Sequence, residues 1–94
     1  MEHVRSVELV GHGLHVRPIT SILSVAKKYQ ARLQVCHGES TADGRSAVDM
    51  ISLQAGPGSV LVFRAEGEDA VRLLDELESL VRRGFHAETS SVRE

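Results

Sequence analysis

Residues 13–18, Gly-Leu-His-Val-Arg-Pro, bring together residue types that could hold and transfer a phosphoryl group. Pro18 has no backbone N–H and suits a first helical turn, so the segment predicts a loop that becomes a helix. The free N–H groups and dipole of a helix start attract anions, and Arg17 adds a planar positive group. A neutral imidazole accepts a phosphoryl group and releases it again, which makes His15 the candidate acceptor.

Other readings of the histidines and of the single cysteine remain open at this point. A histidine near a helix start is often a cap or a surface residue. His12 is expected in the loop beside His15, lining the same site. No Asp, Glu or Cys joins this pair at useful spacing, so no metal site and no cofactor are expected. His37 is interpreted as a turn residue, and Cys36 as a small strand residue rather than a reactive thiol.

Length and composition restrict the class of protein. The 94 residues, 41% of them hydrophobic, predict one domain over residues 1–94, with a core at about 4–85 and a polar tail at 86–94. A formal charge of −2 and three aromatic residues argue against nucleic-acid binding. No apolar run approaches the roughly 20 residues of a membrane span, and the first residues lack a signal peptide's apolar stretch. A cytoplasmic protein is therefore expected.

The elements that must position these residues follow the order βαββαβα. Alternating apolar residues predict strands around 7–9, 33–36, 40–43 and 60–65. The apolar stripe of the first helix is Ile19, Ile22, Leu23, Ala26 and Tyr29. The stripe of the last helix is Val71, Leu74, Leu77, Leu80 and Val81. Gly84 ends that helix. This order predicts an α+β fold, with helices on one face of an antiparallel or mixed sheet.

A short helix is predicted in the middle of the chain. Ser46 is its expected N-cap, and Asp49 stands three residues later in a loose capping-box position. Val48, Ile51 and Leu53 are its candidate apolar contacts. A Gly-Pro-Gly sequence stops the helix. A plain structural role for Ser46, as a helix cap, is one of its open interpretations.

Three segments together resemble HPr, the histidine-containing phosphocarrier family of the bacterial phosphoenolpyruvate-dependent sugar phosphotransferase system. Residues 13–18 are similar to the family's Gly-Leu-His-Ala-Arg-Pro signature. Residues 46–53 resemble the family's segment around a serine, and residues 65–70 its entry to the last helix. The resemblance covers about residues 4–85. It implies an open-faced β-sandwich, with four antiparallel strands and three helices on one face.

The resemblance also implies roles for particular residues. His15 would accept a phosphoryl group on Nδ1 from Enzyme I, which takes it from phosphoenolpyruvate, and donate it to the A domain of a sugar-specific Enzyme II. Arg17 would steady the phosphoryl oxygens. Ser46 matches the family's regulatory serine, the target of an ATP-dependent HPr kinase/phosphorylase. The positions that match the family's docking surface are Val16, Ile19, Thr20, Ala47, Val48 and Ile51. The expected protein is a monomeric carrier for sugar transport and not an enzyme.

The chain departs from the family pattern around the site. Val16 and Ile19 replace alanines that are usual in the family. Asp49 stands where glycine is common and places a negative charge near Ser46. The loop that contains His12 is one residue shorter than usual.

Several alternatives remain. The carrier could serve a nitrogen-regulatory branch, or the chain could be a regulatory module that acts by protein binding under the control of Ser46. A small-molecule-binding domain of similar element order is a third hypothesis. Ile19 and Ile51 could also be ordinary core residues.

Overall fold

The computed structural model describes residues 1–9 and 13–85 of the chain. Within these ranges, strands and helices alternate in the predicted βαββαβα order. The elements are β1 (Glu2–Glu8), α1 (Val16–Ala26), β2 (Arg32–His37), β3 (Ser40–Asp43), α2 (Ala47–Ile51), β4 (Val60–Glu66) and α3 (Ala70–Arg82). None of these described helices has the length and apolar content needed to cross a bilayer.

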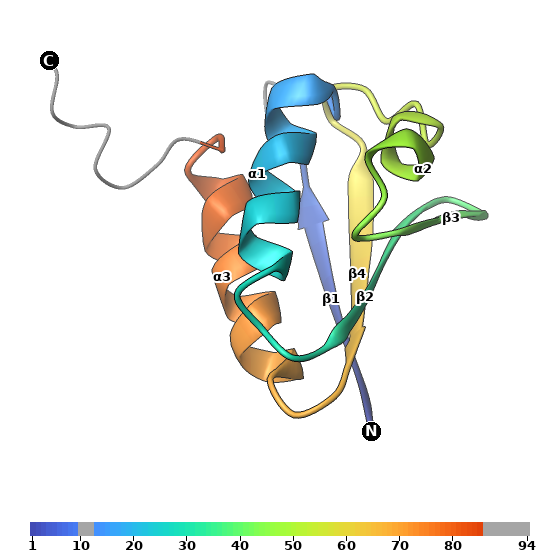
Figure 1. The fold of residues 1–94 in the computed structure, drawn as a ribbon. Coiled ribbons are helices and arrows are strands. Elements are labelled where there is room, and N and C mark those ends of the chain that lie inside the picture. Colours follow the sequence, from blue (N-terminus) through green and yellow to red (C-terminus); the bar gives the residue numbers. More distant parts are fainter. Residues whose placement is uncertain (10–12, 86–94) are drawn as a thin grey trace, which may run out of the picture.

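The four strands form one antiparallel sheet in the order β1-β4-β2-β3. The strand β4 comes last in the chain yet lies between β1 and β2. α1 and α3 lie side by side over one face of the sheet, and α2 lies near the start of α1 (Figure 1). The opposite face carries no helix from the described residues. This arrangement confirms the predicted α+β class and the open-faced β-sandwich.

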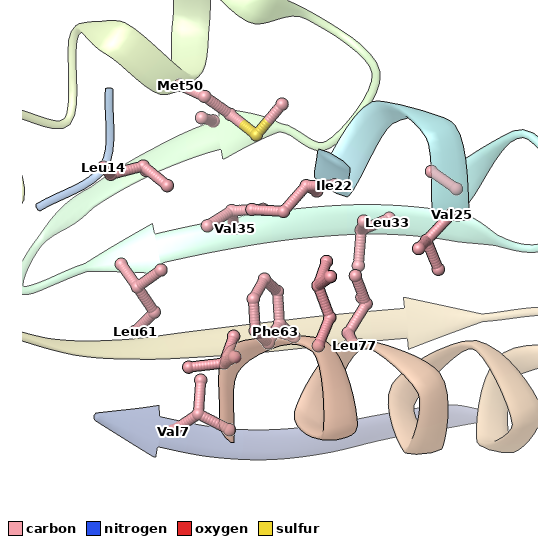
Figure 2. Close-up of a cluster of buried hydrophobic side chains, with 14 of the residues drawn as sticks. Val7, Leu14, Ile22, Val25, Leu33, Val35, Met50, Leu61, Phe63 and Leu77 are labelled. Carbon is pink, nitrogen blue, oxygen red and sulfur yellow. The ribbon is translucent and has the colours of Figure 1, made fainter. Parts of the chain in front are cut away.

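The core lies between the sheet and the helices. Alternate residues of β4 point inward, and Leu61 and Phe63 are fully buried there. Met50 points from α2 toward the sheet and shares the core with Val35 and Ile22 (Figure 2). Burial of one such side chain stabilises the fold by about 1.5–3 kcal/mol. The common core therefore holds the starts of α1 and α2 in fixed positions.

The stripe of α3 is wrong at its first residue. Val71 is 45% exposed, whereas Leu73, which the prediction omitted, is fully buried. The helix begins at Ala70, and a buried face that starts there continues at Leu73 and Leu74, three and four residues on. Val71 is rotated about 100° from that face.

The predicted end of α3 is confirmed. Gly84 has a φ of 69°, which suits glycine, and its N–H donates to the carbonyl of Val81 at 2.9 Å. The Phe85 N–H donates to Leu80 at 2.8 Å and completes the cap. The predicted polar tail, residues 86–94, lies outside the described residues.

Candidate functional site

His15 occupies the N-cap of α1, with extended backbone angles (φ −126°, ψ −166°). Its carbonyl accepts the first helical hydrogen bond, from the Ile19 N–H at 2.9 Å. Its imidazole is exposed and makes no capping hydrogen bond. The predicted helix start is confirmed, and Pro18 lies at the third helical position, where no N–H is needed.

The first turn of α1 keeps two N–H groups without acceptors. These are the N–H groups of Val16 and Arg17, for which no acceptor exists among the residues described. The helix has 11 residues, so its dipole adds positive potential at this end. An anion attached to the imidazole of His15 would find donors and a favourable field beside it.

The segment before His15 is anchored on the loop that follows α2. The Leu14 N–H donates to the carbonyl of Ala55 at 2.8 Å, and the Leu14 side chain is buried. A Cβ on Gly13 would lie 3.1 Å from that carbonyl oxygen and 3.3 Å from the Cα of Gly56. The close approach of the two backbones therefore suits glycine and fixes where His15 stands.

Arg17 is exposed near His15 and makes no ion pair within residues 1–9 and 13–85. Two hydroxyl groups of α1 form hydrogen bonds with backbone carbonyls of the same helix. Thr20 donates to the carbonyl of Val16 at 2.8 Å, and Ser21 donates to that of Arg17 at 3.2 Å. The guanidinium is thus the charged group of this turn that an incoming anion can meet.

An apolar surface patch accompanies His15. Val16 on α1 is 69% exposed, and Val48 and Ile51 on the neighbouring α2 are 74% and 50% exposed. Exposed valine and isoleucine side chains on adjacent helices suit contact with a protein. The prediction that Val48 and Ile51 are apolar contacts of the short helix is therefore wrong, because Met50 fills that role.

The remaining expected docking residues differ in exposure. Thr20 is exposed, and Ala47 is half-buried against the core. Ile19 is 1% exposed and belongs to the buried core, which confirms its place in the stripe of α1 and corrects the expectation that it belongs to a docking surface. Val16 and Ile19 are three residues apart in α1, but Ile19 is packed in the core whereas Val16 is exposed.

Ser46 is the N-cap of α2, as predicted, and its hydroxyl oxygen accepts the Asp49 N–H at 3.2 Å. The capping box is incomplete. The Asp49 carboxylate accepts from the Asp43 N–H at 3.4 Å, and the Ser46 N–H donates instead to the Asp43 carbonyl at 3.0 Å. Ser46 is half-buried, and the acidic residues Asp43 and Asp49 both form hydrogen bonds in this segment.

Arg45 shapes this region although no local pattern in the sequence indicates it. Its guanidinium donates to the carbonyls of Ala26, Tyr29 and Ala31 at 2.9, 3.2 and 2.9 Å. It thereby satisfies carbonyl groups at and after the end of α1. These bonds connect the end of α1 to the segment just before Ser46.

The other histidines do not join His15. His37 ends β2, where its Nδ1 lies 2.9 Å from the carbonyl of Leu53, and His12 lies outside the described residues. No cluster of three or more His, Cys, Asp or Glu that could bind a metal occurs in the described parts of the chain. Cys36 is buried and lies 3.7 Å from the Thr41 hydroxyl across the β2–β3 pair.

A hollow of about 520 Å³ lies elsewhere, on the sheet residues that no helix covers. Its walls carry both charges, among them Arg32, Arg64 and Glu66, and it includes none of the expected site residues. Among the described residues around His15, Val16, Arg17 and Thr20 are exposed, which suits contact with a large partner.

Comparison with known proteins connects this surface to a family. Residues 9–83 match the family model described as the phosphotransferase-system HPr component phosphorylation site. The phosphocarrier protein NPr of Shewanella violacea is 30% identical over 73 residues, which cover 78% of this chain and 80% of that protein. A crystal structure of HPr from Thermoanaerobacter tengcongensis superposes with a TM-score of 0.85 at 25% identity, over 92% of this chain and 98% of the other.

Some relatives are much longer proteins. The multiphosphoryl transfer protein of Xanthomonas campestris pv. campestris is 36% identical over 69 residues, which are 73% of this chain. This chain spans only 8 to 20% of the length of such multiphosphoryl transfer proteins.

Proposed function

The chain belongs to the HPr family of phosphocarrier proteins of the phosphotransferase system, and on this premise we propose that His15 is its phosphoryl acceptor. The donor is phospho-Enzyme I, and the recipient is an Enzyme II A domain. A member of this family carries the group between proteins and is not itself an enzyme.

The single observation that carries the proposal is the position of His15. An exposed imidazole stands at the start of α1, with the N–H groups of Val16 and Arg17 open beside it. A structural N-cap would use its side chain to satisfy one of these donors, and His15 does not.

The chemistry needs one lone pair and a fixed place for charge. The Nδ1 of His15 forms a bond to phosphorus as the bond from phosphorus to the donor breaks, and the same exchange in reverse delivers the group to the recipient. The guanidinium of Arg17 and the N–H groups of the first turn stabilise the negative oxygens during both exchanges. The partners supply the remaining groups, which explains why an exposed surface suffices.

Partner docking would use the apolar patch around His15. Val16, Val48 and Ile51 give both partners the same surface, with Thr20 and Ala47 at its margin. A donor and a recipient that share one surface must bind in turn, so each complex is short-lived. A monomer in the cytoplasm fits this exchange.

Labelling with radioactive phosphoenolpyruvate and Enzyme I tests the proposal. We expect an acid-labile, base-stable phosphate on the wild type and none on His15→Ala, with the free energy of unfolding changed by less than about 0.5 kcal/mol. His37→Ala is the matched control and should keep the label. A wild-type chain that takes up no label would contradict the proposal.

We also propose that Ser46, the N-cap of α2, is a regulatory site that a kinase phosphorylates. A phosphate there would meet the helix start, but also the carboxylates of Asp43 and Asp49. Incubation with ATP and an HPr kinase/phosphorylase, with Ser46→Ala as control, tests it. Label on Ser46 without any on His15 would favour a purely regulatory protein.

The branch of the phosphotransferase system is a further part of the proposal. The similarity to NPr of Shewanella violacea favours a nitrogen-regulatory carrier as the alternative to a sugar carrier. Parallel labelling with a sugar-branch Enzyme I and its nitrogen-branch counterpart separates the two. The faster donor at equal concentration identifies the branch.

A further inference from the structure

Gln54 has a left-handed backbone, with a φ of 50°. Side chains crowd the backbone in this region, so glycine normally occupies it. The described chain follows that rule at Gly38, Gly58, Gly67 and Gly84, which all have positive φ. Gln54 departs from it three residues after the end of α2, beside the candidate site.

Phe85 is the other non-glycine residue with positive φ among the residues described, at 67°. Its ring packs against the core, and this contact offsets the backbone strain. The Gln54 side chain is exposed. Its side-chain amide forms no hydrogen bond with any described residue. The fold therefore gains nothing from this side chain that would offset the strain.

The strained residue lies between the two parts of the proposed site. Its N–H donates to the carbonyl of Ile51, a member of the exposed apolar patch, at 3.1 Å. The next residue, Ala55, accepts the N–H of Leu14, the neighbour of His15. Gln54 therefore lies in the short segment that connects the apolar patch to the loop before His15, and its side-chain amide projects from that segment.

We propose that Gln54 takes part in docking Enzyme I, with its side-chain amide forming a hydrogen bond to a polar group of the Enzyme I molecule docked at His15. This rests on the proposed carrier function and adds a polar contact to an otherwise apolar patch. A side-chain amide can both donate and accept, so it can meet a backbone or side-chain group of Enzyme I. Backbone strain that no contact within the fold offsets is expected at a residue that serves binding.

Three variants separate the amide from the backbone. Gln54→Gly removes both the amide and the strain, Gln54→Ala removes only the amide, and Gln54→Asn keeps an amide on a residue that tolerates positive φ. We expect KM for the carrier in phosphorylation by Enzyme I to rise about three- to tenfold in the glycine and alanine variants, with kcat unchanged. The asparagine variant should recover part of the loss.

Thermal unfolding supplies the independent readout. Gln54→Gly should melt roughly 3–5 °C higher than the wild type, whereas Gln54→Ala should not. Gln34→Ala, an exposed glutamine on the uncovered sheet face, is the control and should leave KM unchanged.

Two results would overturn the proposal on Gln54 alone. One is a labelled wild type with unchanged KM in both the glycine and alanine variants. The other is a KM that rises in Gln54→Gly but not in Gln54→Ala, because the freed backbone and not the lost amide would then be the cause. A wild type that accepts no label would overturn the carrier function as well.

Discussion

The starts of α1 and α2 differ in whether the N-cap side chain accepts a hydrogen bond from an N–H group of the first helical turn. At the start of α2, the Ser46 hydroxyl accepts the Asp49 N–H. At the start of α1, His15 occupies the same N-cap position, but its side chain caps nothing. α1 and α2 pack against one another (Figure 1), but the residue before Ser46 contacts the end of α1, and the loop after α2 contacts its start.

This difference separates stability from function. A satisfied N–H group contributes about 1 kcal/mol to stability and has no capacity left for a ligand. An unsatisfied group at an exposed helix start contributes nothing to stability and remains available to an anion. The start of α2 is therefore expected to matter for folding, and the start of α1 for transfer.

The largest effect is expected when the start of α1 is made to resemble that of α2. His15→Ser should remove all acid-labile phosphate, because a hydroxyl replaces the imidazole. It should also raise the free energy of unfolding by about 0.5–1 kcal/mol, because serine can accept the Arg17 N–H, whereas Pro18 has none. Labelling and urea unfolding measure both effects. A destabilised variant would show that His15 already acts as a cap.

The glycines before the two helices provide the next test. A Cβ on Gly44 would lie 2.4 Å from the Cγ and 2.8 Å from the Cβ of buried Leu33, whereas Gly13 has 3.1 Å of room. We expect Gly44→Ala to cost about 2–3 kcal/mol and Gly13→Ala less than about 1 kcal/mol. Calorimetry compares the two variants. Equal losses would mean that the two helix starts are packed equally tightly.

The cap of α2 should have a smaller effect. Ser46→Ala should cost about 1 kcal/mol, because the Asp49 N–H loses its acceptor, and should leave labelling of His15 unchanged. Ser52→Ala is the matched control: its hydroxyl donates to the Val48 carbonyl within the exposed helix, and its removal should cost little. Impaired labelling in Ser46→Ala would show that the two helix starts are coupled.

The smallest effect is expected far from both starts. Burial raises the pKa of Glu76 on α3, but hydrogen bonds from Lys28 and Tyr29 outweigh burial and lower the pKa below its usual value. A lowered pKa in the folded state adds stability at neutral pH that is lost as the carboxylate protonates. Glu76→Gln should therefore be less stable than the wild type by about 0.5–1 kcal/mol at pH 7.

Chemical denaturation as a function of pH measures this difference. The gap between Glu76→Gln and the wild type should narrow as the pH falls below the ordinary pKa of a glutamate, and close once the carboxylate is protonated in the folded state as well. A gap that persists after that protonation would assign the effect to packing, and a change in His15 labelling would link this contact to the site.

Much of the fold follows from local patterns. The order of elements, the Ser46 cap, the helix start at His15 and the Gly84 stop were predicted from residues close together in the sequence. The failures concern exposure. Val71 was assigned to a buried stripe and is exposed. Ile19 was placed correctly in the stripe of α1 but was also assigned to the docking surface, because the apolar character of a residue does not reveal which neighbouring element covers it.

The sequence by itself determined the helix that begins between His15 and Arg17, which residue types stand at that start, and the βαββαβα order. These depend on side-chain type and on backbone preferences over a few residues. The tertiary structure decided that Val16 is exposed while Ile19 is buried, and that Arg45 binds the carbonyls after α1. It also placed strained Gln54 beside the loop before His15. These features arise when segments distant in sequence pack together, so no short stretch of the chain contains them.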